Sequence, residues 1–82
     1  MTLHDNWHEG TIGLNDDGLA HFWVKSYKRG SVYGINGGRI SKLTIKINGA
    51  TVANYDRGWD VEPDLTRQEV ALAYSIILDN YN

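Results

Sequence analysis

The dipeptide Asn48-Gly49 constrains the fold most, because alternating apolar and polar residues flank it on both sides. A two-residue type I′ turn needs positive φ at both central positions, and Asn followed by Gly adopts that conformation most readily. The turn predicts a hairpin over residues 42–55, with Leu43 on its apolar face. The expected cross-strand pairs are Ile47 with Ala50, Lys46 with Thr51, Ile45 with Val52, Thr44 with Ala53 and Lys42 with Tyr55. This register puts Lys42, Lys46 and Tyr55 together on the polar face.

An N-terminal hairpin is predicted over residues 7–28, with its turn at the run Asn-Asp-Asp-Gly of residues 15–18. A type I turn followed by a left-handed glycine gives a three-residue loop with a bulge. The expected pairs are Asn15 with Leu19, Leu14 with Ala20 and Ile12 with Phe22. This register gathers one apolar face, which a slip by one residue would scatter over both faces. That face consists of Ile12, Leu14, Ala20, Phe22 and Val24.

Between the hairpins, four glycines fall within nine residues, at positions 30–38. Such a density predicts tight turns or a close approach of backbone segments instead of a regular element. The backbone N–H groups of residues 34–39 could also cradle a phosphate. However, the segment lacks the spacing of the known phosphate-binding motifs and leads into a predicted strand, so a structural turn is favoured.

Residues 66–81 predict a C-terminal helix. Thr66 and Glu69 match a capping box, and Leu65 and Val70 stand at the positions of a hydrophobic staple. The apolar stripe at helical spacing consists of Val70, Ala73, Tyr74, Ile77, Leu78 and Tyr81.

Together these elements predict a single α+β domain over residues 1–82, with a four-stranded antiparallel sheet and one helix packed on one face, in the order ββββα. The length of 82 residues suits one small domain. The expected core consists of Ile12, Phe22, Val24, Leu43, Ile45, Ile47, Val52, Val70, Tyr74 and Ile77.

The composition excludes several classes of protein. The chain has no cysteine, which excludes disulfides, thiolate catalysis and cysteine-based zinc sites. No apolar run approaches the roughly 20 residues that span a bilayer, and the first residues lack the basic and apolar regions of a secretory signal. We therefore expect a cytoplasmic protein without a membrane segment, and we expect no metal site and no cofactor.

Charge is unevenly distributed along the chain, although the formal net charge is only −2. Residues 25–57 hold seven of the eight basic groups and one acid, whereas both flanking segments are acidic. The sheet face away from the helix is expected to carry Trp23, Lys25, Tyr27, Lys42, Lys46 and Tyr55. Aromatic rings between lysines are typical of proteins that bind single-stranded nucleic acid. Alternatively, Trp23 and Tyr27 pack under a loop or a second subunit and the lysines are merely solvated, which the net charge favours.

Residues 55–60 are rich in functional side chains. Two carboxylates near Arg57 could position a metal or a proton transfer, but no histidine lies in the segment. The simpler interpretation is that Asp56 and Arg57 form local pairs, Gly58 turns the chain and Trp59 caps the core beside the helix. Arg39, Arg57 and Trp59 complete the set of candidate binding residues.

Two segments are similar to those of a known family: GINGGRISKL at residues 34–43 and NYDRGWD at residues 54–60. They resemble a family of small single-domain proteins of unknown function from Gram-positive bacteria and their phages. The resemblance covers roughly residues 7–81. It implies a cytoplasmic protein of phage or prophage origin, and it implies no activity and no catalytic residue.

The absence of a catalytic motif and the aromatic sheet face lead us to expect a non-enzymatic binding or regulatory module that acts through a protein partner. The alternative is a module that binds single-stranded nucleic acid through the basic, aromatic face. A homodimer is a further expectation, because it would cover Trp23 and Tyr27 and support a small domain.

Overall fold

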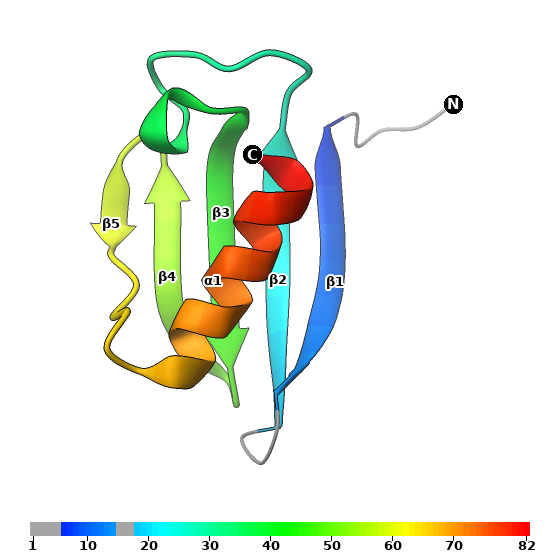
Figure 1. Cartoon of the computed structure of the whole chain (residues 1–82), viewed down its shortest axis with the longest axis vertical. Coiled ribbons are helices and arrows are strands. Elements are labelled where there is room, and N and C mark those ends of the chain that lie inside the picture. The colour runs from blue at the N-terminus through cyan, green and yellow to red at the C-terminus, as the bar shows by residue number, and fades with distance from the viewer. Residues whose placement is uncertain (1–5, 15–17) are drawn as a thin grey trace.

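A computed structural model describes residues 6–14 and 18–82 of the chain. It contains a five-stranded antiparallel sheet, with the strands in sequence order, and one α-helix. The elements are β1 (Trp7–Leu14), β2 (Gly18–Ser26), a 3₁₀ turn η1 (Ile35–Gly37), β3 (Ile40–Ile47), β4 (Ala50–Asp56), β5 (Trp59–Val61) and α1 (Gln68–Tyr81). Figure 1 shows α1 crossing one face of the sheet diagonally. Within the described ranges, no second α-helix lies on the other face of the sheet.

The prediction of an antiparallel sheet with a C-terminal helix on one face is confirmed, but the sheet has five strands instead of four. The additional strand is β5, which pairs with β4 through Tyr55 and Trp59. The chain reverses at Arg57, whose φ is 57°, and the Asp56 N–H donates to the Gly58 carbonyl at 2.9 Å. With only three residues, β5 is too short to display a hydrophobic period in the sequence.

The central hairpin forms at the predicted turn, where Asn48 and Gly49 have φ of 51° and 84°. Its register follows the prediction only as far as Thr51, because a bulge then pairs Ile45 with Ala53. Beyond the bulge, Lys42 faces Asp56 and Leu43 faces Tyr55. The predicted pair of Lys42 with Tyr55 is therefore wrong, and Tyr55 lies on the helix-covered face. One extra residue in a strand moves every later side chain to the opposite face.

The N-terminal hairpin forms with a register two residues from the predicted one, since Leu14 pairs with Gly18 and Ile12 with Ala20. A shift of two residues preserves the faces, so the predicted apolar face is retained. The observed register puts Gly10 opposite Phe22, where a Cβ at residue 10 would lie 2.9 Å from the ring. Gly18 has the predicted left-handed conformation, with φ of 88°. The three residues before it, 15–17, lie outside the described residues.

The helix begins two residues later than predicted, and its N-cap, Arg67, makes no side-chain capping hydrogen bond. The predicted capping box is wrong. The Asp64 carboxylate accepts the N–H and the hydroxyl of Thr66, and Glu69 pairs with Arg67 at 2.8 Å. The two hydrogen bonds from Thr66, chiefly the one from its hydroxyl, lower the pKa of Asp64 below its ordinary value. Leu65 is 56% exposed, so the hydrophobic staple is also wrong.

The core lies between α1 and the covered face of the sheet. All ten predicted core residues belong to it, with Ile12 and Tyr74 only partly buried. The core also includes Leu14, Ala20, Ile35, Ile40, Ala53, Tyr55 and Ala73. Ile45 of β3 and Ile77 of α1 are completely buried, which fixes the helix over the middle of the sheet.

The glycine-rich connection between β2 and β3 is a compact turn, as predicted. A Cβ at Gly34 would lie 1.9 Å from the Gly38 carbonyl oxygen, so this position excludes any side chain. The N–H groups of Gly34 and Gly38 donate to carbonyls within the connection and are not directed at a ligand. The Asn82 side chain, just after α1, accepts from Ile40 N–H at 3.0 Å and donates to the Ile35 carbonyl at 3.1 Å. These two bonds hold the connection against the end of the helix.

Candidate functional site

The uncovered face of the sheet, which we call the open face, carries polar and aromatic side chains from four strands. Cross-strand neighbours share a face, so the register identifies its members. They are Trp7, Glu9 and Thr11 of β1; His21, Trp23 and Lys25 of β2; Lys42, Thr44 and Lys46 of β3; and Thr51, Asn54 and Asp56 of β4. The predicted positions of Trp23, Lys25, Lys42 and Lys46 on this face are confirmed.

The remaining predicted site residues lie elsewhere. Tyr55 and Trp59 pack on the covered face, with ring centroids 4.8 Å apart. The Trp59 ring also packs on Tyr74 of α1, with ring centroids 5.9 Å apart. Trp59 therefore caps the core beside the helix, as the simpler interpretation predicted. Arg39 precedes β3, and its carbonyl accepts from Tyr27 N–H at 2.9 Å. Tyr27 and Arg57 lie at one end of the open face, in the pocket described below.

A row of four side chains crosses the centre of the open face. His21 Nε2 lies 2.7 Å from Glu9 Oε2, and the His21 ring stacks on Trp23 with centroids 4.3 Å apart and planes 14° apart. Lys46 is the cross-strand partner of His21, and its Nζ lies 6.0 Å from the centroid of the Trp23 ring. These contacts give both rings defined neighbours on the molecular surface. We call Glu9, His21, Trp23 and Lys46 the central row.

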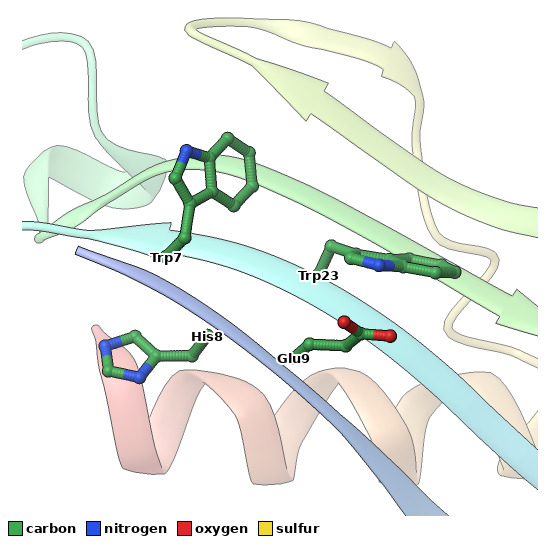
Figure 2. Close-up of a pocket in the computed structure, with 4 residues that line it drawn as sticks. All are labelled: Trp7, His8, Glu9 and Trp23. Atoms are coloured by element: carbon green, nitrogen blue, oxygen red, sulfur yellow. The ribbon is translucent and has the colours of Figure 1, made fainter. Parts of the chain in front are cut away.

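A hollow of about 450 Å³ lies beside the central row, between two indole rings. Its lining residues are Trp7, His8, Glu9 and Trp23, and we call it the indole cleft. Figure 2 shows both indoles on the side of the sheet away from α1, whereas His8 points to the helix side. The centroid of the His8 ring lies 4.9 Å from that of Tyr81. His8 therefore packs the edge strand of the cleft against the end of the helix.

A second hollow, of about 520 Å³, lies on the other side of Trp23. It is lined mainly by apolar atoms and includes Leu19, which is 58% exposed. The complete lining is Gly18, Leu19, His21, Trp23, Lys46, Asn48 and Gly49. Trp23 thus forms a wall shared by two surface hollows, and it stands at the centre of the face.

A third hollow, of about 400 Å³, lies where β2 ends and β3 begins, beside the turn between β4 and β5. We call it the cationic pocket, and its lining is Lys25, Tyr27, Ser31, Tyr33, Ser41, Lys42, Asp56 and Arg57. Lys42 Nζ lies 3.8 Å from Asp56 Oδ1. Lys25 Nζ lies 5.5 Å from the Tyr27 ring centroid, and Arg57 Cζ lies 5.7 Å from that of Tyr33.

The electrostatics of the cationic pocket act on Tyr27. The Lys25 ammonium beside the hydroxyl lowers the pKa of Tyr27 below its ordinary value, and Ser41 and Lys42 act more weakly in the same direction. The slight burial of the phenol opposes this effect. These contacts favour the ionised form of Tyr27 over the neutral phenol.

Ser41 forms part of the same pocket and is 7% exposed. Its Oγ is covered and has no hydrogen bond of normal geometry to any group within residues 6–14 and 18–82. The Ser41 carbonyl, in contrast, accepts from Arg57 N–H at 3.0 Å. The Ser41 hydroxyl nevertheless lies close to that of Tyr27, since it lowers the pKa of Tyr27.

Several of these site residues were missed from the sequence. Trp7 and Glu9 share the open face with Trp23, and this neighbourhood depends on the register of the N-terminal hairpin, which the sequence predicted two residues away. Ser31, Tyr33 and Ser41 gather in one pocket only because the connection, β3 and the β4–β5 turn converge. No spacing in the sequence indicates that convergence.

Two further findings concern the described part of the chain. It contains no group of three or more His, Cys, Asp or Glu residues that could hold a metal ion. None of its helices is long and apolar enough to cross a membrane.

The fold and its surface define a class of small antiparallel sheet-and-helix domain, with one face covered by a helix and one aromatic face left open. The chain belongs to the family described as Domain of unknown function (DUF7678), whose model matches residues 6–82. The resemblance to small domains of unknown function is confirmed to this extent. Neither the search of curated proteins nor the search of solved structures gave a match.

Proposed function

We propose that the protein is a small non-enzymatic binding module that recognises a protein partner through its open face. The observation that carries this proposal is the central row, in which the Trp23 indole stacks on His21 and lies near the Lys46 ammonium. Tryptophan, tyrosine and arginine dominate the binding energy of protein interfaces. Rings that are already ordered lose less conformational entropy on binding, so the central row is suited to anchoring a partner.

The charges of the open face support a protein partner. Glu9 lies in the indole cleft next to Trp23, and Asp56 pairs with Lys42. A surface with both signs of charge complements a protein surface, whereas a carboxylate beside the main aromatic anchor repels a phosphate backbone.

The dimensions of the face also support a protein partner. The two longest extents of the molecule are 35 and 29 Å, and the sheet lies in their plane (Figure 1). A standard interface buries about 800 Å² on each partner, which such a face can provide. The hollows on the two sides of Trp23 would receive apolar side chains of the partner.

A regulatory role follows from this mode of binding, because a small module acts by occupying a surface of its partner. A phage or prophage origin is part of this proposal, and it rests only on the resemblance carried by residues 34–43 and 54–60. With that origin, the partner would be a host or defence protein, and both proteins would meet in the cytoplasm.

Affinity capture from a cell lysate with three immobilised baits tests the proposal. The baits are the unchanged protein, Trp23→Ala and Leu72→Ala, whose side chain is 42% exposed on the outer side of α1. We expect a partner that the unchanged protein and Leu72→Ala recover equally and that Trp23→Ala loses. Recovery of no reproducible partner, or equal recovery by Trp23→Ala, would contradict the proposal.

A second copy of the chain is one candidate for this partner. Pairing of two open faces would cover both indoles, but it would bring Lys25 and Lys46 of the two copies together unless Glu9 reaches across. Sedimentation at high micromolar concentration tests this pairing. A strict monomer would mean that the partner is a different protein.

Single-stranded nucleic acid is the second candidate ligand, and the cation–ring neighbours on the open face favour it. Lys25 Nζ lies 5.8 Å from the Trp7 ring, and Lys46 Nζ lies 6.0 Å from the Trp23 ring. Bases could stack on the rings while the ammonium groups meet phosphates. A titration with short oligonucleotides at about 50 mM salt tests this candidate. Absence of binding at about 50 µM protein would eliminate it, because electrostatic attachment alone is visible under these conditions.

A further inference from the structure

We propose that the cationic pocket is a binding site for a phosphate group. The pocket lies at the edge of the sheet where β2 and β4 end and where β3 begins, at the top of Figure 1. Its lining is distinct from that of the indole cleft. The inference stands on the pocket alone and goes beyond the proposed protein-binding function.

The charge of the pocket fits a phosphate. Lys25, Lys42 and Arg57 contribute three positive charges, and Asp56 contributes one negative charge. The excess of two positive charges matches a phosphate monoester, which carries about −1.5 to −2 at neutral pH. The 3.8 Å separation of Lys42 Nζ and Asp56 Oδ1 is longer than an N–H···O hydrogen bond, so the ammonium can also donate to an anion.

Hydroxyl donors complement these charges. Tyr27, Ser31 and Ser41 each bring an O–H group to the pocket. Ser31 Oγ accepts from Tyr33 N–H at 3.2 Å, which leaves its own hydrogen available for donation. A phosphate offers three strong acceptor oxygens, so it can accept from hydroxyl and cationic donors at the same time.

Ser41 supplies a further observation. Its Oγ is covered and makes no hydrogen bond of normal geometry to the described residues, but its hydroxyl lies close enough to that of Tyr27 to lower the pKa of Tyr27. The Ser41 and Tyr27 hydroxyls are therefore neighbours in the pocket, where both can donate to one anion.

Arg57 adds a third observation. Its φ of 57° is unfavourable for a residue with a side chain, and glycine would adopt this conformation without strain. The turn is fixed by the bond from Arg57 N–H to the Ser41 carbonyl at 3.0 Å. Strained positions of this kind cluster at binding sites. Glycine at residue 57 would relieve the strain, but it would remove the guanidinium from the pocket.

The size of the pocket indicates the class of ligand. A volume of about 400 Å³ lies within the range of small-molecule sites and exceeds the needs of a free ion. Tyr33, which is 57% exposed at the pocket, offers a ring on which a planar base can stack. The shared chemistry is therefore a phosphate group, either free or carried by a nucleoside.

Titration of the full chain with inorganic phosphate, followed by two-dimensional NMR of the backbone amides, tests the site. Sodium chloride at matched ionic strength is the reference. We expect saturable shifts confined to the pocket segments around residues 25–33, 41–42 and 56–58. Parallel titrations with a nucleoside monophosphate and with its nucleoside distinguish the two sources. Tighter binding of the nucleotide than of phosphate identifies a nucleotide site, and equal binding identifies a site for the phosphate alone.

Two variants separate binding from folding. Arg57→Gly relieves the backbone strain and Ser41→Ala removes a hydroxyl that makes no hydrogen bond of normal geometry, so both should remain folded, which thermal unfolding checks. Nevertheless, we expect Arg57→Gly to weaken phosphate affinity about tenfold or more and Ser41→Ala about three- to tenfold, since charge-assisted bonds are lost. Arg67→Gln removes the same charge at the start of α1, outside both the pocket and the open face, and is the matched control, with affinity within about twofold.

Trp23→Ala separates the phosphate site from the protein-binding face, although the two share Lys25, Lys42 and Asp56. Trp23→Ala should abolish partner capture and leave phosphate binding unchanged, because Trp23 is not in the pocket lining. Shifts that chloride reproduces, no saturation up to about 10 mM phosphate, or unchanged affinity in Arg57→Gly would overturn the phosphate site.

Discussion

The two faces of the sheet are built from alternate residues of the same strands, yet they have different chemistry. On the covered face, Val24 and Ile45 are completely buried against α1. On the open face, their strand neighbours Trp23 and Lys46 form an ordered aromatic and cationic surface. The need to bury apolar area accounts for the covered face. It does not account for indoles held at the surface, and this difference directs the functional interpretation to the open face.

Truncation of a covered-face residue should have the largest effect on stability. Ile45→Ala removes a completely buried side chain and leaves a cavity, so we expect a loss of about 2–5 kcal/mol in the free energy of unfolding. Urea denaturation measures this loss, and Leu72→Ala on the exposed side of α1 is the control. A loss below about 1 kcal/mol would mean that the core does not lie between α1 and β3.

The contact between the helix end and the glycine-rich connection should contribute the next largest effect. Asn82→Ala leaves Ile40 N–H and the Ile35 carbonyl without their side-chain partner, at a cost of about 1–3 kcal/mol. Asn80→Ala is the matched control, because the exposed Asn80 side chain donates within its own helix, to the Ile76 carbonyl at 2.8 Å. Equal stabilities of the two variants in thermal unfolding would show that the Asn82 bonds do not hold the connection.

The smallest effect is expected at the exposed start of the helix. The Thr66 hydroxyl is the main cause of the lowered pKa of Asp64, so Thr66→Ala should raise this pKa towards its ordinary value. A carboxyl whose pKa is lower in the folded state adds stability above its unfolded pKa, and this stability is lost as the pH falls through the folded pKa. The variant should therefore be less stable near neutral pH and equal to the unchanged protein in acid. NMR titration of the Asp64 carboxyl measures the shift, and an unchanged pKa would contradict the assigned cause.

The covered face was largely predictable from the sequence. Alternation of apolar residues identified its members in both hairpins, and the Asn48-Gly49 turn fixed the pairing of Ile47 with Ala50. The prediction tolerated the wrong register in the N-terminal hairpin, because a shift of two residues leaves each side chain on the same face. Whether a strand residue is buried thus depends on which face of the sheet it lies on, and less on which residue it pairs with.

The open face and the cationic pocket were only partly predictable, because both depend on exact neighbours. A bulge at Val52 moved Tyr55 from the open face into the core, and no local pattern distinguishes that bulge from a regular strand. The helix start was mispredicted because Asp64, a competing acceptor two residues upstream, bonds Thr66. Ser41 and Arg57 meet only after three separate segments converge, which is information that sequence spacing does not carry.

We infer that the covered face stabilises the fold and that the open face serves binding. Urea denaturation tests this most directly, by comparing the double variant Trp7→Ala/Trp23→Ala with Ile45→Ala. Both indoles are partly exposed, and their contacts are a ring stack and two cation–π neighbours. We expect the double variant to lose less than about 1.5 kcal/mol, well below the loss in Ile45→Ala. If the double variant unfolds as readily as Ile45→Ala, the indoles support the fold, and the open face is not primarily a binding surface.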